Sequence, residues 1–430
     1  MAQWTLRAFF VLLAVARSAP SHADNWPRFR GPTGQGMSDD KNVPVRWSNT
    51  ENVAWKTPLP GQGWSSPVVW GEQVFVTATT DDGVSCHVVA VNRRDGKIQW
   101  DREVFKQKPS RKEQRNSYAT PTPVTDGKRV YAFFAGGGAA AVNCTDGAVA
   151  WTNNEHEFYS QHGLGASPIL YKDSVIMPFD WSSPEGDKTV GWQKPWDKSF
   201  VLALDVNSGK VKWRAKRGLS RIAHVTPQVV EVGGKPVLVS GAGDVIQGFN
   251  PDTGELLWTA RSQGEGVVPS IVVGDGLAFT SSGFEKSTIR AVKLDPAAKG
   301  DVTQSHIAWE QTRAVPTVPS FIYADGLLFT LKENGIVLCI DAKTGEIVWQ
   351  ERIEGNFAAS PVCANGNIYF ISMDGECVIV KAARKFEEVA RNQLPEQVQA
   401  SPAISHGQLF IRTDKHLYCI GTGASARNEQ

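Results

Sequence analysis

The stretch Ile336–Trp349 reads IVLCIDAKTGEIVW, and similar stretches recur along most of the chain. Its first five residues are β-branched or aliphatic apart from one Cys, a composition typical of a β-strand. Residues 341–345 (DAKTG) form a turn signal, because Asp bonds nearby backbone groups and Gly tolerates the positive φ of a tight hairpin. A second strand then begins. The stretch therefore predicts a β-hairpin that ends in a large aromatic residue.

Two landmarks recur and together define a repeating unit. The first is a Ser/Thr-Pro or Pro-Ser step followed by two apolar runs with a polar turn between them. It occurs eight times, as in SSPVVWGEQVFV, VPSFIYADGLLFT and ASPAISHGQLFI. The second is an Asp/Asn-x-x-Gly hairpin with its aromatic residue, as in VNRRDGKIQW and LDVNSGKVKW. Each unit holds four strand-sized runs in about 40 to 60 residues, which is typical of a propeller blade.

The repeats therefore predict an all-β fold, an eight-bladed β-propeller of four-stranded antiparallel blades. The Trp near the end of each unit is expected to pack between adjacent blades. The eighth unit stops at Tyr418-Cys419-Ile420 without a Trp strand, whereas Asn52–Lys56 supplies such a strand without a preceding unit. We expect this N-terminal strand to complete the eighth blade and close the ring, because closure removes the exposed edges of a sheet.

The N-terminus predicts export. Arg7 precedes the short apolar run Ala8–Ala16, and Ser21-His22-Ala23 is a small-x-Ala cleavage site. The run is too short to span a bilayer, so it indicates a signal peptide. We predict a signal peptide over residues 1–23, a strap over 24–51, the propeller over 52–421 and a tail over 422–430. The mature protein is expected to be periplasmic or extracellular, monomeric and without a transmembrane segment.

Charge and cysteine usage narrow the function classes. The chain has 45 Lys and Arg against 44 Asp and Glu, a balance that does not favour nucleic acid as a partner. Six cysteines in an exported protein could form disulfides. However, Cys339, Cys377 and Cys419 lie in apolar strand runs, and sister repeats carry Ala90 and Ala203 at the position of Cys339. A small buried residue explains both choices, so packing is the favoured interpretation over bonding.

The Asp-x-x-Thr-Gly-x-x-x-Trp hairpins resemble the repeats of the pyrroloquinoline-quinone (PQQ) type β-propellers. The opening Trp26–Gly36 (WPRFRGPTGQG) and closing runs such as Leu409–Thr413 resemble the exported PQQ-like proteins common in planctomycete bacteria. The resemblance covers nearly the whole mature chain. It implies the propeller fold, but it says less about function, because propellers host many unrelated activities.

Two functional types of this repeat family imply different roles. The quinoprotein dehydrogenases hold PQQ and Ca²⁺ with oxygen ligands, an Asp base and an adjacent Cys-Cys disulfide. This chain has no adjacent Cys pair, and no stretch onto which those ligands could be carried. The second type resembles the periplasmic scaffold subunit of the outer-membrane β-barrel assembly machinery, which carries no cofactor. That subunit is a lipoprotein, and a lipobox Cys is missing here. No cofactor is therefore expected, although PQQ with calcium stays an alternative.

The funnel of a propeller lies where each inner strand begins, which in this chain is just before each Ser/Thr-Pro step. Arg in this ring could grip a carboxylate or phosphate, and amides could fix orientation. A polar channel that merely holds water would also look like this, and a metal site on His162 and His224 alone is weakly supported. The candidate ligand-binding residues are Trp64, Asn116, Tyr118, His162, Arg221, His224, Glu265, Arg313, Asn356 and Gln397, with Ser117, Gln161 and Gln399 beside them.

Two insertions interrupt the repeats, Lys106–Arg115 (KQKPSRKEQR) between the first two blades and Ser182–Lys198 within the third. Loops on a rigid scaffold often carry function, but a plain solvated loop fits as well. We expect a non-enzymatic binding or scaffold protein, whose funnel face contacts an envelope protein or a small polar or anionic ligand. The alternative is a PQQ-dependent sugar or alcohol oxidoreductase. A glycan-binding or glycan-cleaving propeller ranks last, because it would need paired carboxylates and only Glu265 is evident in the funnel.

Overall fold

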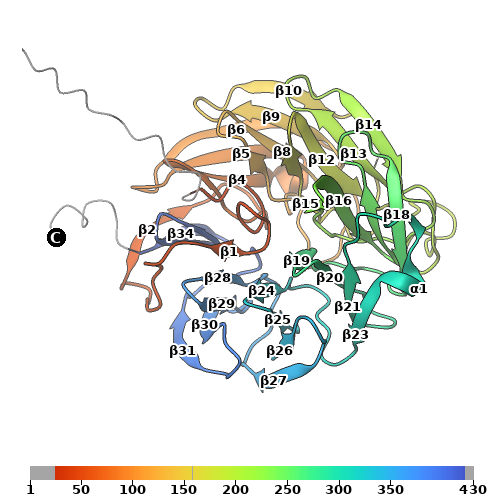
Figure 1. Ribbon diagram of the computed structural model, residues 1–430. Coiled ribbons are helices and arrows are strands. Elements are labelled where there is room, and N and C mark those ends of the chain that lie inside the picture. The colour runs from red at the N-terminus through yellow and green to blue at the C-terminus, as the bar shows by residue number, and fades with distance from the viewer. Residues whose placement is uncertain (1–24, 157, 422–430) are drawn as a thin grey trace, which may run out of the picture.

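The computed structural model describes residues 25–156 and 158–421, and in these ranges the strands form eight sheets around a central axis (Figure 1). Each sheet contains a four-stranded antiparallel blade, and in blades one to seven the chain passes from the innermost strand to the outermost strand before it enters the next blade. The predicted eight-bladed propeller is confirmed. The predicted signal peptide and tail lie outside the described residues.

The strands of blades one to four are short at the axis and longer outside. Blade one consists of β3 (Val68–Trp70), β4 (Gln73–Thr80), β5 (Ser85–Asn92) and β6 (Ile98–Lys106). Blade two consists of β7 (Val124–Thr125), β8 (Arg129–Phe133), β9 (Ala139–Asn143) and β10 (Val149–Asn153). Blade three consists of β11 (Ile169–Tyr171), β12 (Ser174–Phe179), β13 (Phe200–Asp205) and β14 (Val211–Lys216), and blade four consists of β15 (Gln228–Val232), β16 (Lys235–Ala242), β17 (Val245–Phe249) and β18 (Leu256–Arg261).

Blades five to eight repeat this pattern, with an α-helical turn α1 (Thr303–His306) between the third and the last strand of blade five. Blade five consists of β19 (Val272–Gly274), β20 (Leu277–Ser281), β21 (Ile289–Lys293) and β23 (Ile307–Gln311), blade six of β24 (Ile322–Ala324), β25 (Leu327–Leu331), β26 (Ile336–Asp341) and β27 (Ile347–Arg352), blade seven of β28 (Val362–Ala364), β29 (Asn367–Ile371), β30 (Glu376–Lys381) and β31 (Glu388–Gln393), and blade eight of β32 (Ala403–Ser405), β33 (Gln408–Arg412) and β34 (His416–Ile420) together with β2 (Val53–Pro58).

The N-terminal strand closes the ring, as predicted. In Figure 1, β2 at the red end of the chain lies beside β34 at the blue end. The two strands pair antiparallel, with Trp55 opposite Cys419 and Lys56 opposite Tyr418. Two further short strands add to blades in parallel and were not predicted, β1 (Met37–Ser38) beside β28 and β22 (Gly300–Asp301) beside β18.

The recurring Trp and the recurring turn Gly are partners across neighbouring blades. The indole N–H of Trp309 in blade five donates to the carbonyl of Ala342 in the hairpin turn of blade six, at 2.9 Å. Gly345 of that turn has φ +78°, and a Cβ there would lie 2.6 Å from the Trp309 ring. Other blades repeat the contact, in the pairs Trp55 with Gly96, Trp100 with Gly147, Trp151 with Gly209 and Trp213 with Gly254.

This arrangement predicts that two glycines of blade six respond differently to substitution. Gly326 has almost the same φ, +75°, as Gly345, but nothing lies within 4 Å of its Cβ position. We expect Gly326→Ala to cost about 1 kcal/mol of unfolding free energy through backbone strain. Gly345→Ala is expected to cost about 2–4 kcal/mol, because the methyl group must also displace the indole. Urea unfolding of the two variants measures the difference, and equal losses would contradict the Trp–Gly contact.

The Ser/Thr landmark forms a belt of hydrogen bonds around the axis. The backbone N–H of each landmark residue donates to the hydroxyl of the landmark residue in the next blade, for example Ser66 to Thr122 at 2.8 Å and Ser360 to Ser401 at 2.8 Å. In the described residues seven such bonds run from blade one to blade eight, through Ser167, Thr226, Ser270 and Ser320. The repeated hydroxyl therefore ties the inner strands together.

The strap crosses the axis on the face that carries the hairpin turns. Trp26 pairs with Val69 of blade one, and the backbone of Thr125 in blade two donates to the carbonyl of Pro27. Arg30 is fully buried, and its guanidinium donates to the carbonyl oxygens of Phe321 in blade six and Pro361 in blade seven. The strap thus bonds to blades on both sides of the channel. The opposite face, with the loops that join one blade to the next, is called the funnel face below.

The six cysteines are buried and free, so packing explains them. Burial raises the pKa of the Cys339 and Cys363 thiols to about 12, which leaves them protonated near neutral pH. We expect no thiol to react with Ellman's reagent in the native protein and all six to react in guanidinium chloride. Reaction of fewer thiols after unfolding would indicate a disulfide instead.

No helix in the described ranges is both long enough and apolar enough to cross a membrane.

Candidate functional site

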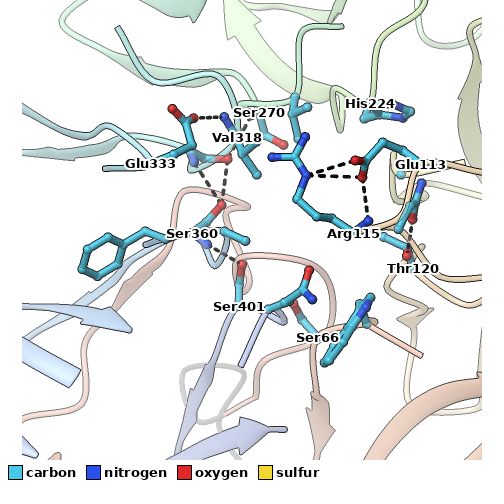
Figure 2. A pocket seen from close by; sticks show the side chains of 18 of the residues that line it. Ser66, Glu113, Arg115, Thr120, His224, Ser270, Val318, Glu333, Ser360 and Ser401 are labelled. Atoms are coloured by element: carbon cyan, nitrogen blue, oxygen red, sulfur yellow. Dashed lines mark hydrogen bonds and ion pairs between the residues drawn. The ribbon is translucent and has the colours of Figure 1, made fainter. Parts of the chain in front are cut away.

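The funnel face contains a cavity of about 480 Å³ on the propeller axis. It is lined by the loops that precede the inner strands and by most of the hydroxyl belt, including Ser66, Ser270, Ser360 and Ser401 (Figure 2). Phe29 of the strap also lines it. Because the strap crosses the channel at the other end, the cavity opens toward the funnel face and the strap contributes to its floor.

Apolar and aromatic side chains line the cavity from several blades. Trp64 comes from blade one, Phe284 from the turn between β20 and β21, and Phe357 and Met373 from the blade seven side. Phe284 is 55% exposed although it lines the cavity, so its aromatic ring lies at the cavity mouth and is partly in contact with solvent. A concave, mainly apolar cavity with a few polar groups is the usual form of a ligand site.

Two histidines form one wall of the cavity. Burial and, to a smaller extent, the nearby His162 lower the pKa of His224 to about 3. Burial also lowers the pKa of His162, whose ring packs edge-on against Trp192 at 5.7 Å. Trp192 belongs to the insertion at 182–198, so this loop lies on the funnel face. Both imidazoles are neutral at neutral pH and offer a hydrogen-bonding wall without charge.

Charged groups lie at the mouth on opposite sides. Arg115 pairs through its Nε with Glu113 at 3.3 Å, and Figure 2 shows its guanidinium directed across the cavity. Glu333, from the turn between β25 and β26, accepts bonds on Oε1 from the backbone N–H groups of Thr317 and Val318 and from the Thr317 hydroxyl. These bonds fix Glu333 at the cavity wall.

The structure brings half of the predicted ligand-binding residues together. Trp64, Asn116, His162, His224 and Asn356 line the cavity, as does Gln399. Asn116 is held there because its side-chain N–H donates to the carbonyl of His162 at 2.7 Å.

The other predicted residues lie on the funnel face outside the cavity lining, each with local contacts. Arg221 is paired with Asp244 at 2.6 Å and Glu285 at 2.9 Å. The phenol of Tyr118 donates to the carbonyl of Ser110 at 3.0 Å, within the blade one to blade two loop. The remaining residues are Glu265, whose pKa burial raises, Arg313, which is exposed, and Gln397, whose backbone N–H donates to Asp414.

Several lining residues could not be found from the repeats. Phe29 lies in the strap, far from any blade landmark, and Phe284 and Glu333 lie in turns between second and third strands. The signal that was available is the Ser/Thr step itself. This landmark marks the start of each inner strand, and most of its hydroxyl residues line the cavity.

A site for PQQ with Ca²⁺ needs oxygen ligands for the metal among the residues of the funnel. Ca²⁺ takes six to eight oxygen ligands, mostly from carboxylates and carbonyls. Among the described residues no three His, Cys, Asp or Glu side chains gather in a way that could hold a metal ion. The described part of the funnel therefore lacks the cluster of carboxylates that such a Ca²⁺ site would use.

Comparisons with known proteins give one family and a broad set of fold relatives. The family model described as outer membrane protein assembly factor BamB matches residues 37–179 and 197–428. The assembly factor BamB of Moranella endobia is 28% identical over 197 residues, which is 41% of this chain and 48% of that relative. This chain thus spans about half of that relative's length.

Two further relatives are enzymes by name. The tetrathionate hydrolase of Acidithiobacillus ferrooxidans is 23% identical over 374 residues, which is 77% of this chain and 67% of that protein. The structure of a europium-containing methanol dehydrogenase superposes with a TM-score of 0.69 at 11% identity and covers 93% of this chain and 98% of its own. At that identity the structural likeness shows the fold alone. The family match, which extends over most of the chain, is the more specific finding: the chain belongs to the family of the outer membrane protein assembly factor BamB.

Proposed function

We propose that this protein is a non-enzymatic binding scaffold of the cell envelope, and that it holds a partner on its funnel face. The observation that carries the proposal is the form of the cavity. It is open at one end, contains Phe29 of the strap at the other, and has the exposed ring of Phe284 at its lip. Such a cavity suits the anchoring of a side chain or a small ligand from the funnel side.

The family adds support for a role in assembly. The family model and several of the relatives carry the name outer membrane protein assembly factor, which favours a role in assembly over an enzymatic one. The predicted export of this chain is consistent with such a role in the cell envelope. The proposal assigns the protein no enzymatic activity and no cofactor.

The proposal is tested against the quinoprotein alternative by thermal unfolding of the mature protein with PQQ, with and without Ca²⁺. A ligand that binds only the native state must raise the midpoint temperature, because at a concentration of about a hundred times its Kd it adds about 2.7 kcal/mol to the free energy of unfolding. We expect no change in midpoint with either addition. A Ca²⁺-dependent rise, together with quinone absorbance in the purified protein, would overturn the proposal in favour of a dehydrogenase.

A further inference from the structure

We propose that the funnel takes an extended acidic segment of a partner protein, with an apolar side chain in the cavity and carboxylates along the loop Lys106–Arg115. This inference rests on the proposed function, since it names the chemistry of the partner that the funnel face would hold. It arises from a loop that the propeller fold does not require.

The loop is built into the cavity mouth. The backbone N–H of Glu113 donates to the carbonyl of His162 at 3.2 Å, and Glu113, Arg115 and Asn116 all line the cavity. At the other end of the loop, the side-chain amide of Gln107 donates to the carbonyl of Gly83 at 2.9 Å and accepts from the backbone of Gly136 at 2.9 Å. These bonds to blades one, two and three hold the loop along one side of the mouth.

The charge of the loop is poorly compensated. Its ten residues include five basic side chains and one acidic one. Arg115 pairs with the neighbouring Glu113, and the ammonium of Lys112 lies over the ring of Tyr118 at 5.4 Å. In the part of the chain that the structure describes, no ion pair engages Lys106, Lys108 or Arg111, and all three are exposed. The loop therefore presents a cationic surface to whatever occupies the mouth.

The cavity beside the loop favours a peptide over a hydrocarbon chain. Phe29, Phe357 and Met373 supply apolar surface for one side chain. Around them lie the amides of Asn356 and Gln399 and the O–H groups of the hydroxyl belt, which can pair with the N–H and C=O groups of an extended backbone. A lipid chain would offer no partner to the amides of Asn356 and Gln399, which costs free energy in a desolvated site.

The test uses a short fluorescein-labelled peptide with Leu-Phe at its centre and Asp and Glu on both sides, and measures its binding to the mature protein by anisotropy. The triple variant Lys106→Glu, Lys108→Glu, Arg111→Glu is expected to weaken binding at least about tenfold, and raising NaCl from about 50 to about 300 mM should weaken binding to the wild type. The matched control is Lys128→Glu, Lys210→Glu, Lys343→Glu, which changes the net charge equally at exposed positions on the opposite face. It should change binding less than about twofold.

A second peptide separates this inference from the proposed function. It keeps Leu-Phe but carries Asn and Gln in place of Asp and Glu, and both peptides are also tested on Phe284→Ser. Equal binding of the two peptides, weakened by Phe284→Ser, would overturn the acidic partner and leave the funnel as a binding site. The inference would also be overturned if the acidic peptide failed to bind. The same holds if its binding were changed neither by the triple variant of the loop nor by Phe284→Ser. Loop-dependent binding to phosphatidylglycerol vesicles in place of the peptide would assign the loop to a membrane surface instead.

Discussion

Asp180→Ala is expected to lower the free energy of unfolding by about 3–5 kcal/mol. Asp180 follows β12 and contacts Arg217, which follows β14, with 2.7 Å between a carboxylate oxygen and Nε, and the two side chains are 1% and 0% exposed. The same guanidinium donates to the hydroxyl of Ser240 in blade four at 2.8 Å. The pair therefore joins blade three to blade four. Removal of the carboxylate leaves a buried cation without its counter-charge, which is far more costly than loss of an exposed pair.

The controls separate charge burial from packing. Asp187→Ala breaks the exposed pair with Lys194 in the adjacent insertion, and should cost less than about 1 kcal/mol. The double variant Asp180→Leu, Arg217→Met should recover most of the stability lost in Asp180→Ala, because no buried charge remains. Urea unfolding followed by Trp fluorescence measures all three. A loss below about 1 kcal/mol for Asp180→Ala would show that the pair does not couple the blades.

Glu396→Gln is expected to destabilise the closure of the ring in a pH-dependent way. The Glu396 side chain is 8% exposed and contacts Lys56 of the closing strand at 2.8 Å, the Thr413 hydroxyl at 2.6 Å and His416 Nδ1 at 2.9 Å. Burial alone would raise the pKa of Glu396, but these hydrogen bonds outweigh it and hold the pKa at about 2. A pKa that is depressed in the folded state adds stability above the unfolded value of about 4.5, and this stability is lost as the pH falls toward 2.

The expected loss in Glu396→Gln at pH 7 is therefore about 2–3 kcal/mol. The gap between wild type and variant should narrow steadily from pH 4.5 to pH 2. Glu388→Gln is the matched control, because that carboxylate pairs with Arg391 on the surface of β31, and it should cost less than about 0.5 kcal/mol. Urea unfolding across this pH range gives the gap directly. A gap that stays constant with pH would contradict the role assigned to the carboxylate.

The sequence predicted the architecture because the fold consists of short repeats. The hairpin at Ile336–Trp349 contains both its turn and its strands, so local chemistry was enough to define a blade. Closure by β2 followed from a missing Trp strand at one end and a surplus one at the other. The added strands β1 and β22 could not be predicted, because each has two residues and depends on contacts with distant blades.

The site was only partly predictable, because it also depends on contacts between segments that are distant in the sequence. Residues next to the Ser/Thr step, such as His162 and Asn356, reach the cavity because the repeat places them at the start of an inner strand. Arg221 has the same position in its repeat, but Asp244 and Glu285 pair with it and hold it away from the cavity lining. Phe29 enters from the strap, which no repeat describes. Which side chain reaches the axis is therefore decided by partners from other blades.

The central claim, that the funnel face holds the partner, is tested most directly by site-specific photo-cross-linking in the producing cell. A benzophenone amino acid replaces Phe284 at the cavity lip, and in a second strain it replaces Leu256 on the outer strand β18, where the side chain is 43% exposed. We predict a discrete protein adduct from position 284 that is lost when the funnel is altered by Lys106→Glu, Lys108→Glu, Arg111→Glu, and none from position 256. Adducts at position 256 without any at position 284 would contradict the claim and place the partner on the outer edge of the propeller.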